Sequence, residues 1–567
     1  MNLFYKISPK LRFPLVLVAV IGIAYLLSLF RVRIDLTSEK RYSLSDYTKE
    51  SLTNLKDVIY IKVYLEGDEL PLNIKNLRTG VKEQLEEYKI YGKDKFEFEF
   101  IDPSESPKKE KRFAMYKKLA ESGLFPIEAQ EVSDKGKTSQ KMVFPGLIMS
   151  CQGRQIGINL LSNTSGVAAE SEVNVNNSIE ELEYKLTNGI QNVLREKKQA
   201  IAFIEGHNEV PEINTVSISK ALAEYYNVRR GALNGQIGIL DNFKAVIVAK
   251  PMKKFSEKDK YVLDQYIMQG GNVLWLEEGT NTNLDSLFAN SYTMALAQQT
   301  GLNDMLFNYG VRINQNLIMD KQSAPIGIRI EGTDGQARIE MFPWYYFPVI
   351  SPNNNHPISK NLDFIRTQFV SSLDTVGADA EIQKTILLST SNHSLTESIP
   401  ARIELAQAKR MPPDEYLTAG SQDISVLLEG NFKSNFRMRS PSKIFPDETI
   451  PEPMYESNYS KMIVISDGDI IKNEMTQNGR PYPVGFDIFT KQRFEGNKEF
   501  ITNAVNYLCE DYELMNLRSR ELKLRLLNKD QIKNQRLIIQ LLNMGIPVLI
   551  IILSGVLVVY FRKRKYT

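Results

Sequence analysis

Two long stretches of the chain contain no charged residue. Residues 13–30 read FPLVLVAVIGIAYLLSLF, and residues 537–561 have a polar start and are then nearly pure aliphatic. An α-helix of 18 residues rises about 27 Å, just enough to cross a hydrocarbon core. A cleaved signal peptide is the alternative for the first stretch, but no small-x-small cleavage pattern follows it. A buried core helix is the alternative for the second. We expect two membrane spans.

The segments outside these spans are basic. Residues 1–12 and 562–567 together carry seven Lys and Arg and no acid. Short basic tails are typical of the cytoplasmic side, whereas charges in a long translocated loop have little influence. We therefore expect both termini in the cytoplasm and a large domain on the other side. A basic, helix-prone stalk over residues 511–536 would lie near lipid headgroups.

The first part of the large domain, residues 31–198, alternates between strand and helix patterns. A β-rich run at 58–65 and an alternating run at 96–100 bracket a helix at 72–88. A helix at 108–121 and strands near 127–133 and 140–151 follow. Ser178 and Glu181 have the spacing of a capping box and predict a helix start at Ser178. The order suggests a thioredoxin-like layer, although no C-x-x-C motif is present.

The second part, residues 199–510, has a regular strand–helix repeat that a long irregular insertion at about 280–459 interrupts. Predicted strands alternate with helices, and this order indicates a doubly wound parallel sheet. The strands are expected at 200–204, 245–248, 272–276 and 461–466, with helices at 217–226, 256–269 and 497–509.

Polar residues follow two of these strands. His207 and Glu209 come after the first strand, and Asp467 and Asp469 come after the last. Ligands of such sheets bind at the carboxyl ends of the strands, so these four residues are candidate ligand contacts. The alternative for His207 and Glu209 is a turn held by local hydrogen bonds. Asp467 and Asp469 could ligate a hard cation, or simply form a strand-end turn.

The insertion contains a dense aromatic run, FPWYYF at residues 342–347. Trp344 and Tyr345 are therefore candidate partner contacts, because aromatic side chains are enriched at interface hot spots. A strand of the core is the alternative. Neither Cys151 nor Cys509 suggests chemistry, and both are expected to be buried structural thiols.

Composition and missing motifs exclude several functions. The 70 Lys and Arg nearly balance the 68 Asp and Glu, which argues against a dedicated nucleic-acid binder. Gly136-Lys137-Thr138 ends like a phosphate loop, but residue 131 is Glu where the leading glycine should stand, so no ATP-binding loop is present. G-x-G-x-x-G, G-x-S-x-G and H-E-x-x-H motifs are also absent. We expect no cofactor, no metal and no catalytic residue.

Several segments, in order along nearly the whole chain, resemble the ABC-transporter auxiliary proteins of bacterial gliding motility, the GldG family. They are DLTSEKRYSLS at 35–45, FIDP at 100–103, EGHNE at 205–209, SDGD at 466–469 and GNKEF at 496–500. The resemblance implies a two-pass subunit of the bacterial inner membrane with a periplasmic domain, working with a separate ABC ATPase and a separate permease. It also implies that the second domain has a glutamine-amidotransferase-like fold without its catalytic cysteine.

The fold class expected is therefore α/β, with a tail and first span at 1–30, the two domains described above, the stalk, and a second span with its tail at 537–567. Our hypothesis is a non-enzymatic auxiliary subunit of an ABC-type complex involved in gliding motility, whose periplasmic domain binds a protein or polymer partner. One alternative is a membrane-anchored hydrolase or amidotransferase-like enzyme using His207 and Glu209. The other is a solute-binding receptor.

Overall fold

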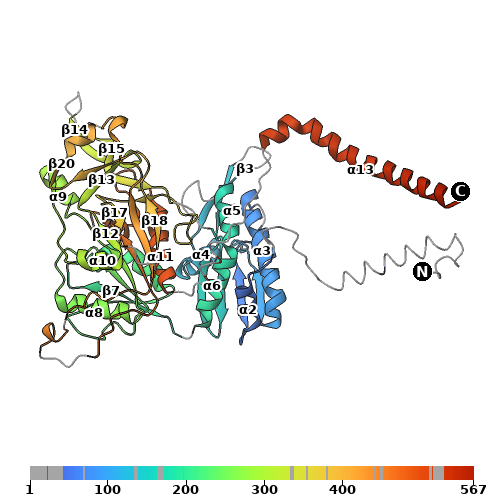
Figure 1. Ribbon diagram of the computed structural model, residues 1–567. Coiled ribbons are helices and arrows are strands. Elements are labelled where there is room, and N and C mark those ends of the chain that lie inside the picture. Colours follow the sequence, from blue (N-terminus) through green and yellow to red (C-terminus); the bar gives the residue numbers. More distant parts are fainter. Residues whose placement is uncertain are drawn as a thin grey trace. The chain divides into compact units, whose positions relative to one another are not determined.

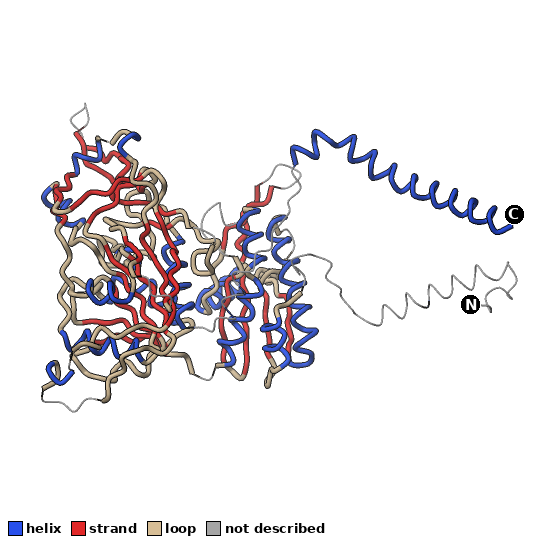
Figure 2. The backbone as a smooth tube through the Cα atoms, viewed as in Figure 1, coloured by secondary structure: helices blue, strands red, loops and turns tan. Residues whose placement is uncertain are grey.

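Strands and helices alternate along most of the chain in the computed structural model (Figures 1 and 2). Two units can be separated, residues 44–520 and the terminal segments 1–43 with 521–567, and each is described by itself. The structure describes residues 22, 43–67, 70–132, 138–161, 171–195, 197–331, 337–352, 355–377, 381–410, 412–439, 441–446, 451–509, 514, 517 and 529–566.

The first part of residues 44–520 is built on a mixed four-stranded sheet in the order β2-β1-β5-β6. Strand β1 (Ile59–Val63) pairs in parallel with β2 (Phe96–Phe100) and antiparallel with β5 (Gly146–Cys151), which pairs antiparallel with β6 (Arg154–Asn159). A separate hairpin joins β3 (Ile127–Val132) to β4 (Thr138–Val143). The parallel β1–β2 pair requires a crossover, which the helix between these strands provides.

Amphipathic helices cover this sheet. Helix α3 (Leu72–Gly92) buries a stripe at Ile74, Leu77, Val81, Leu85 and Tyr88, whose spacing of three or four residues places them on one face. Other helices of this part are α2 (Asp46–Thr53), α4 (Lys109–Glu121), α5 (Glu172–Glu180) and α6 (Leu182–Leu194). Helices α3 and α6 share one hydrophobic core with β1 and β5.

The predicted helix start at Ser178 is wrong. The N-cap of helix α5 is Ser171, seven residues earlier along the chain, whose side chain accepts a hydrogen bond from the amide of Asn174. Ser178 lies inside α5, and its hydroxyl donates to the carbonyl oxygen of Asn174 at 2.6 Å. Its hydroxyl thus bonds back to the preceding turn, as serine does inside a helix.

A seven-stranded sheet forms the centre of the second part, in the order β18-β21-β22-β10-β9-β7-β8. Five adjacent strands are parallel, the four predicted from the sequence and β8, which was not predicted, and β21 and β18 continue the sheet in antiparallel pairing. The strands are β7 (Ala200–Glu205), β8 (Asn227–Ala232), β9 (Ala245–Ala249), β10 (Asn272–Leu276), β18 (Ile382–Ser389), β21 (Asp423–Gly430) and β22 (Ser460–Ile465).

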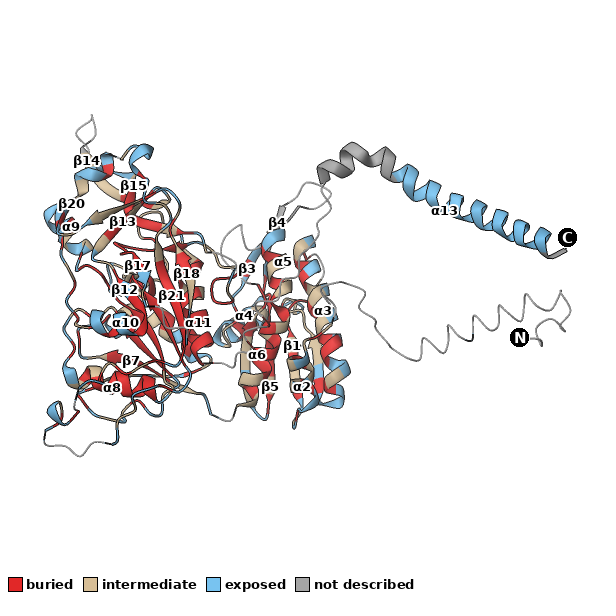
Figure 3. Cartoon of the chain, in the orientation of Figure 1, coloured by how far each residue is buried: buried red, intermediate tan, exposed pale blue. Residues whose placement is uncertain are grey.

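Helices cover both faces of this sheet. Helices α7 (Glu212–Ala223) and α11 (Glu495–Cys509) share a core with one face, and α8 (Glu257–Met268) shares a core with the other. All residues of β9, β10 and β22 are buried, as expected of central parallel strands (Figure 3). Helix α7 lies several residues before the predicted 217–226, because Pro211 provides its N-cap.

The insertion between β10 and β22 is more ordered than predicted, because it supplies β18 and β21 to the main sheet. The rest forms a β-rich layer around a hairpin of β14 (Ser323–Glu331) and β15 (Ala337–Ile350). Its smaller elements are α9 (Leu284–Asn290), β11 (Tyr292–Ala295), α10 (Asn303–Tyr309), β12 (Val311–Ile313), β13 (Asn316–Asp320), β16 (Ile365–Arg366), β17 (Leu373–Thr375), β19 (Ser394–Ser398) and β20 (Ala401–Glu404).

The described part of the terminal unit is the long helix α13 (Lys529–Tyr566). Within it, Gln540–Arg564 is apolar and long enough to cross a membrane, with a mean hydropathy of 2.6 and no residue buried against the protein. This segment overlaps the predicted second span. Apart from residue 22, the predicted first span lies outside the described residues, and so does most of the stalk.

Candidate functional site

The carboxyl ends of three adjacent strands bring five ionisable side chains to one edge of the main sheet. Lys250 follows β9, Glu277 and Glu278 follow β10, and Asp467 and Asp469 lie just beyond β22. Because β9, β10 and β22 are parallel neighbours, these residues meet although they are far apart in sequence. This is the edge at which doubly wound sheets hold ligands.

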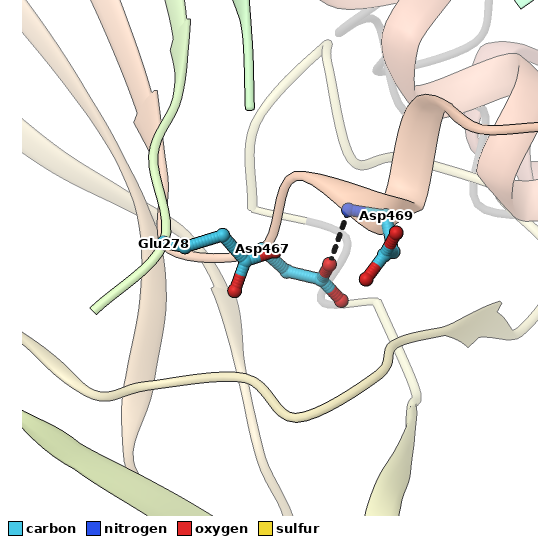
Figure 4. A group of neighbouring side chains, drawn as sticks. All are labelled: Glu278, Asp467 and Asp469. Carbon is cyan, nitrogen blue, oxygen red and sulfur yellow. Dashed lines mark hydrogen bonds between the residues drawn. The ribbon is translucent and has the colours of Figure 1, made fainter. Parts of the chain in front are cut away.

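The side chains of Lys250, Glu278, Asp467 and Asp469 form a buried ion cluster. The Lys250 ammonium lies 2.5 Å from Asp469 Oδ2 and 3.2 Å from Glu278 Oε1. Asp467 accepts hydrogen bonds from the amides of Asp469 at 2.7 Å and Gln368 at 2.8 Å, the first of which Figure 4 shows. Asp467 is completely buried and Glu278 is 4% exposed. Protein groups therefore surround these carboxylates.

Backbone geometry supports the cluster. The amide of Gly468 donates to Glu278 Oε1 at 2.9 Å. A Cβ on Gly468 would lie 2.4 Å from Lys250 Cβ, so only glycine permits this approach of the two strand ends. Lys250 itself has a φ of 52°, a backbone angle that residues other than glycine adopt at a cost in free energy. The close approach of the strand ends places the ammonium among the carboxylates.

Burial and mutual charge set the protonation of the cluster. Burial raises the pKa of Glu278 to about 7, although the Lys250 ammonium opposes this shift. Burial and the neighbouring carboxylates raise the pKa of Asp467 well above its usual value. Burial would also raise the pKa of Asp469, but the nearby Lys250 outweighs it and holds that pKa below its usual range. Asp469 is therefore the ionised partner of Lys250.

This arrangement includes both candidate cation ligands, Asp467 and Asp469. Carboxylate oxygens of Glu278, Asp467 and Asp469 lie within 4.8 Å of one another, a separation that a metal ion could bridge. The Lys250 ammonium, however, already contacts two of these carboxylates. The chain thus supplies a positive charge of its own within this group of carboxylates.

Glu277 points away from this network and forms a separate buried contact. It is 1% exposed, and Thr300 donates a hydrogen bond to its Oε1. Burial raises the pKa of Glu277 to about 8. The side chain is therefore largely protonated at neutral pH.

His207 is held between two carboxylates at the end of β7. Its Nδ1 lies 3.2 Å from Glu209 Oε1 and its Nε2 lies 3.2 Å from Asp259 Oδ2, while its ring stacks on Phe255. Burial would lower the pKa of His207, but Glu209 and Asp259 outweigh it and raise that pKa. His207 is 6% exposed.

The hydrogen bonds of Asp259 show what this arrangement does. Asp259 Oδ2 accepts from the hydroxyl of Ser256, which caps α8, and its Oδ1 accepts from the amide of Gly235. His207 thereby ties the end of β7 to the start of α8 and to the loop after β8. We call the His207, Glu209 and Asp259 side chains the histidine clamp. Both ring nitrogens face carboxylates, which leaves neither one directed at a nucleophilic side chain.

A short loop after β9 connects the two networks. The Lys250 side chain lies in the ion cluster, and the amides of Met252 and Lys253 donate to the carbonyl oxygen of His207 at 2.9 and 2.8 Å. His207 and Glu209 are thus linked to Asp467 and Asp469 through this loop. Sequence reasoning missed Lys250, Glu278 and Asp259. Lys250 and Glu278 directly follow buried strands, which is the same signal that identified Asp467.

The aromatic candidates lie elsewhere. Trp344 and Tyr345 are 1% and 8% exposed on β15, and Trp344 packs against Tyr346 and Phe347 in the core of the insertion. Both residues are buried, which agrees with the alternative prediction of a core strand and not with an exposed partner-binding edge. Among the described hydrogen bonds, none joins Trp344 or Tyr345 to the ion cluster or to the histidine clamp.

A cavity that the sequence did not suggest lies within residues 44–520, between the four-stranded part and the seven-stranded part. Its volume is about 210 Å³, and its walls include Phe125, Tyr184, Glu224, Lys498 and Asn506. The Lys498 ammonium lies 5.3 Å from the centre of the Phe125 ring, a cation–π contact across this boundary.

Known proteins resemble this chain over most of its length. Residues 38–150 match a domain of unknown function, DUF7088. An uncharacterized protein of Borreliella burgdorferi is 21% identical over 557 residues, covering 95% of each chain. Two solved structures each align with 55% of this chain. The mmIFT52 N-terminal domain is 15% identical, with a TM-score of 0.32 and 98% of its chain covered. A putative ThuA-like protein from Parabacteroides merdae is 10% identical, with a TM-score of 0.26 and 90% of its chain covered.

The second part of the chain carries the family assignment. Residues 198–504 match the ABC transport auxiliary family, described as an ABC-type uncharacterized transport system. This match includes the ion cluster and the histidine clamp, and it covers more than half of the 567 residues. The chain therefore belongs to the ABC transport auxiliary family.

Proposed function

We propose that this chain is a non-catalytic, membrane-anchored auxiliary subunit of an ABC-type complex. The observation that carries the proposal is the filled carboxyl edge of the main sheet. Lys250 neutralises the buried carboxylates there, and both nitrogens of His207 are engaged by Glu209 and Asp259. Ligand sites of this fold class lie at this edge, so side chains that are engaged with one another there favour a non-catalytic role.

Anchoring is supported by the long apolar segment of α13. Its apolar surface is exposed in the structure, which in water would be unfavourable and in a bilayer is expected. The basic residues after it, together with Lys6, Lys10 and Arg12, favour cytoplasmic termini and a large periplasmic domain. This two-pass arrangement in the inner membrane is part of the proposal.

The partners follow from the family and from the missing phosphate loop. A chain of an ABC-type system that has no ATP-binding loop requires a separate ATPase, and two spans are too few to form a permease by themselves. The gliding-motility role is also part of the proposal, and it is supported by the ordered motifs at 35–45, 205–209 and 466–469. The large domain would then bind a protein or polymer partner.

Purification of the tagged full chain from its own membranes in mild detergent tests this proposal. We expect an ABC ATPase and a permease to co-purify in fixed ratio, as measured by quantitative mass spectrometry. A charge-reversed variant of the exposed Lys56, Lys56→Glu, serves as a control for non-specific loss. Recovery of the chain alone, at the same yield and in several detergents, would contradict the proposal.

The enzyme alternative has its own test. If His207 and Glu209 were catalytic, His207→Gln and Glu209→Gln would abolish function while the protein stayed folded and assembled. We expect instead that any loss of function follows loss of stability, measured by urea unfolding of the same preparations. A folded His207→Gln variant that assembles normally but is inactive would favour the enzyme.

A further inference from the structure

Basic side chains gather at the amino-terminal end of α8. Lys253 and Lys254 lie three and two residues before its N-cap, Ser256, and Arg439 lies 2.7 Å from Glu257 in its first turn. The turn η6 (Pro441–Lys443), which Figure 1 shows in orange beside α8, adds Lys443. Lys258 of α8 lies over the ring of Phe445 just after this turn. We call Lys253, Lys254, Arg437, Arg439 and Lys443 the basic surface.

Four of these cations form no ion pair with the acidic residues that the structure describes, which do not include Asp447 and Glu448. Lys253, Lys254, Arg437 and Lys443 are exposed, and none of them forms an ion pair within the described part of the chain. Residues 433–443 contain four Lys and Arg and no acid. This is unusual here, because residues 31–516 as a whole carry more acidic than basic residues. Among the described residues, the basic surface therefore carries more positive than negative charge, with Glu257 as the acid that pairs with Arg439.

An apolar tip stands between two of the arginines. Met438 is 88% exposed, flanked by Arg437 and Arg439. The chain beneath it is fixed, because Ser434 and Asn435 donate hydrogen bonds to the buried carboxylate of Asp264 at 2.7 and 2.8 Å. Phe436 and Phe445 also pack edge-on against Tyr261. A fixed, protruding methionine surrounded by cations is thus presented to the outside.

We propose that the basic surface docks on an anionic bilayer, with Met438 entering the headgroup region. Clusters of lysine and arginine are attracted to acidic lipids, and an apolar side chain among them adds burial at the lipid boundary. Lysine is depleted in protein–protein interfaces, whereas three of these five cations are lysines. The inference rests on the proposed function for one point, that α13 anchors the chain and keeps a bilayer within reach.

The full chain in lipid nanodiscs provides the test. Met438→Cys is labelled with a polarity-sensitive fluorophore, which is selective because Cys151 and Cys509 are each only 2% exposed. Nanodiscs contain phosphatidylcholine alone or mixed with phosphatidylglycerol, each with a headgroup-located quencher. We expect quenching only with phosphatidylglycerol, decreasing as salt is added. The same label on Ile339→Cys, 74% exposed on β15, should stay unquenched.

Charge variants sharpen the result. Each cation is expected to contribute about fivefold to the docking equilibrium, so the Arg437→Glu/Lys443→Glu double variant should lower it more than about 25-fold. The Lys56→Glu/Arg338→Glu double variant makes the same change of net charge at other exposed positions and should leave the quenching unchanged. Equal loss in both double variants would overturn the proposal.

Two further outcomes would also overturn it. Equal quenching, or none, in the two lipid mixtures would show that acidic lipid is not recognised. Protection of the label by poly-glutamate but not by lipid would identify an acidic protein surface as the occupant. Membrane anchoring by α13 is measured separately from docking of the basic surface. A chain without an anchor would leave the nanodisc fraction after an alkaline wash.

Discussion

Replacement of Lys250 by methionine tests the internal neutralisation of the ion cluster. Methionine keeps much of the side-chain volume and removes the ammonium that lies 2.5 Å from Asp469 and 3.2 Å from Glu278. Removal of one partner of a buried ion pair typically costs about 3–5 kcal/mol, because the remaining charge is buried without compensation. We expect Lys250→Met to lower the free energy of unfolding by this amount at pH 8.

The cost should depend on pH, with a sign that follows from Glu278. Its pKa is about 7 in the folded chain and 4.5 as a reference, so the folded state binds more protons between these values. The contribution of Glu278 to stability therefore falls as pH rises through this window. Lys250 opposes the rise in the pKa of Glu278 and holds the pKa of Asp469 down, so both pKa values should rise when its ammonium is removed. The destabilisation should thus be smaller at pH 5, where these carboxyls become neutral.

Tryptophan fluorescence can follow this unfolding directly. Trp275 lies on β10 close to Glu278 and Trp344 lies in the insertion, and both are buried. They are the only two tryptophans of the chain. Urea titrations of the full chain in detergent at pH 5 and pH 8 would compare the variant with Lys253→Met, which removes an exposed lysine three residues away. Equal stability of Lys250→Met and the parent chain, or the same loss at both pH values, would refute the reasoning.

Three other predictions follow from the same structure. His207→Gln should destabilise the chain by about 1–3 kcal/mol, and more below pH 6.5 than above it. The raised pKa of His207 gives stability that is present below the pKa of the unfolded chain and is lost as pH rises through the pKa of the folded chain. Urea unfolding at pH 6 and pH 8 measures this difference, and a loss of stability that does not depend on pH would contradict the prediction. Gly468→Ala should lower the free energy of unfolding by at least about 2 kcal/mol, because the added Cβ would clash with Lys250 Cβ. Gly479→Ala should lower it by less, because Gly479 has a positive φ but open space around it. The unfolding midpoints of the two variants measure this difference. Ile551→Arg should disfavour membrane insertion of α13 by about 3 kcal/mol; release by alkaline extraction measures it, with Ile551→Leu as control, and full retention of the arginine variant would argue against a span.

The sequence predicted the elements of the main sheet better than their neighbours. Buried aliphatic runs such as 245–249 and 272–276 mark central strands, and the parallel order follows from the helices between them. This placed His207 and Asp467 at the correct edge. Lys250 was missed although it directly follows a buried strand, and its contact with Asp469 could not be predicted because strand order is not visible in a single sequence. Only the structure shows that β22 joins β10 directly, which brings Asp469 to Lys250.

The insertion could not be predicted for the same reason. Strands β18 and β21 pair with partners that periodicity does not reveal, and the prediction was an irregular segment. The aromatic run around Trp344 lacks the polar alternation of a half-exposed strand, because side chains on both faces of β15 are buried there. The helix start at Ser178 was wrong because two cap candidates compete locally, and Ser171 provides the cap.

The order of the main sheet has a consequence for the biogenesis of the chain. Strand β22 lies at the centre, between β10 and β21, but it is synthesised only after the whole insertion. Until Ile465 has emerged, β10 has an open edge and the carboxylates of the ion cluster are incomplete. Exposed strand edges favour aggregation during folding. We therefore expect a nascent chain of this kind to be prone to aggregation until nearly all of the large domain has been made.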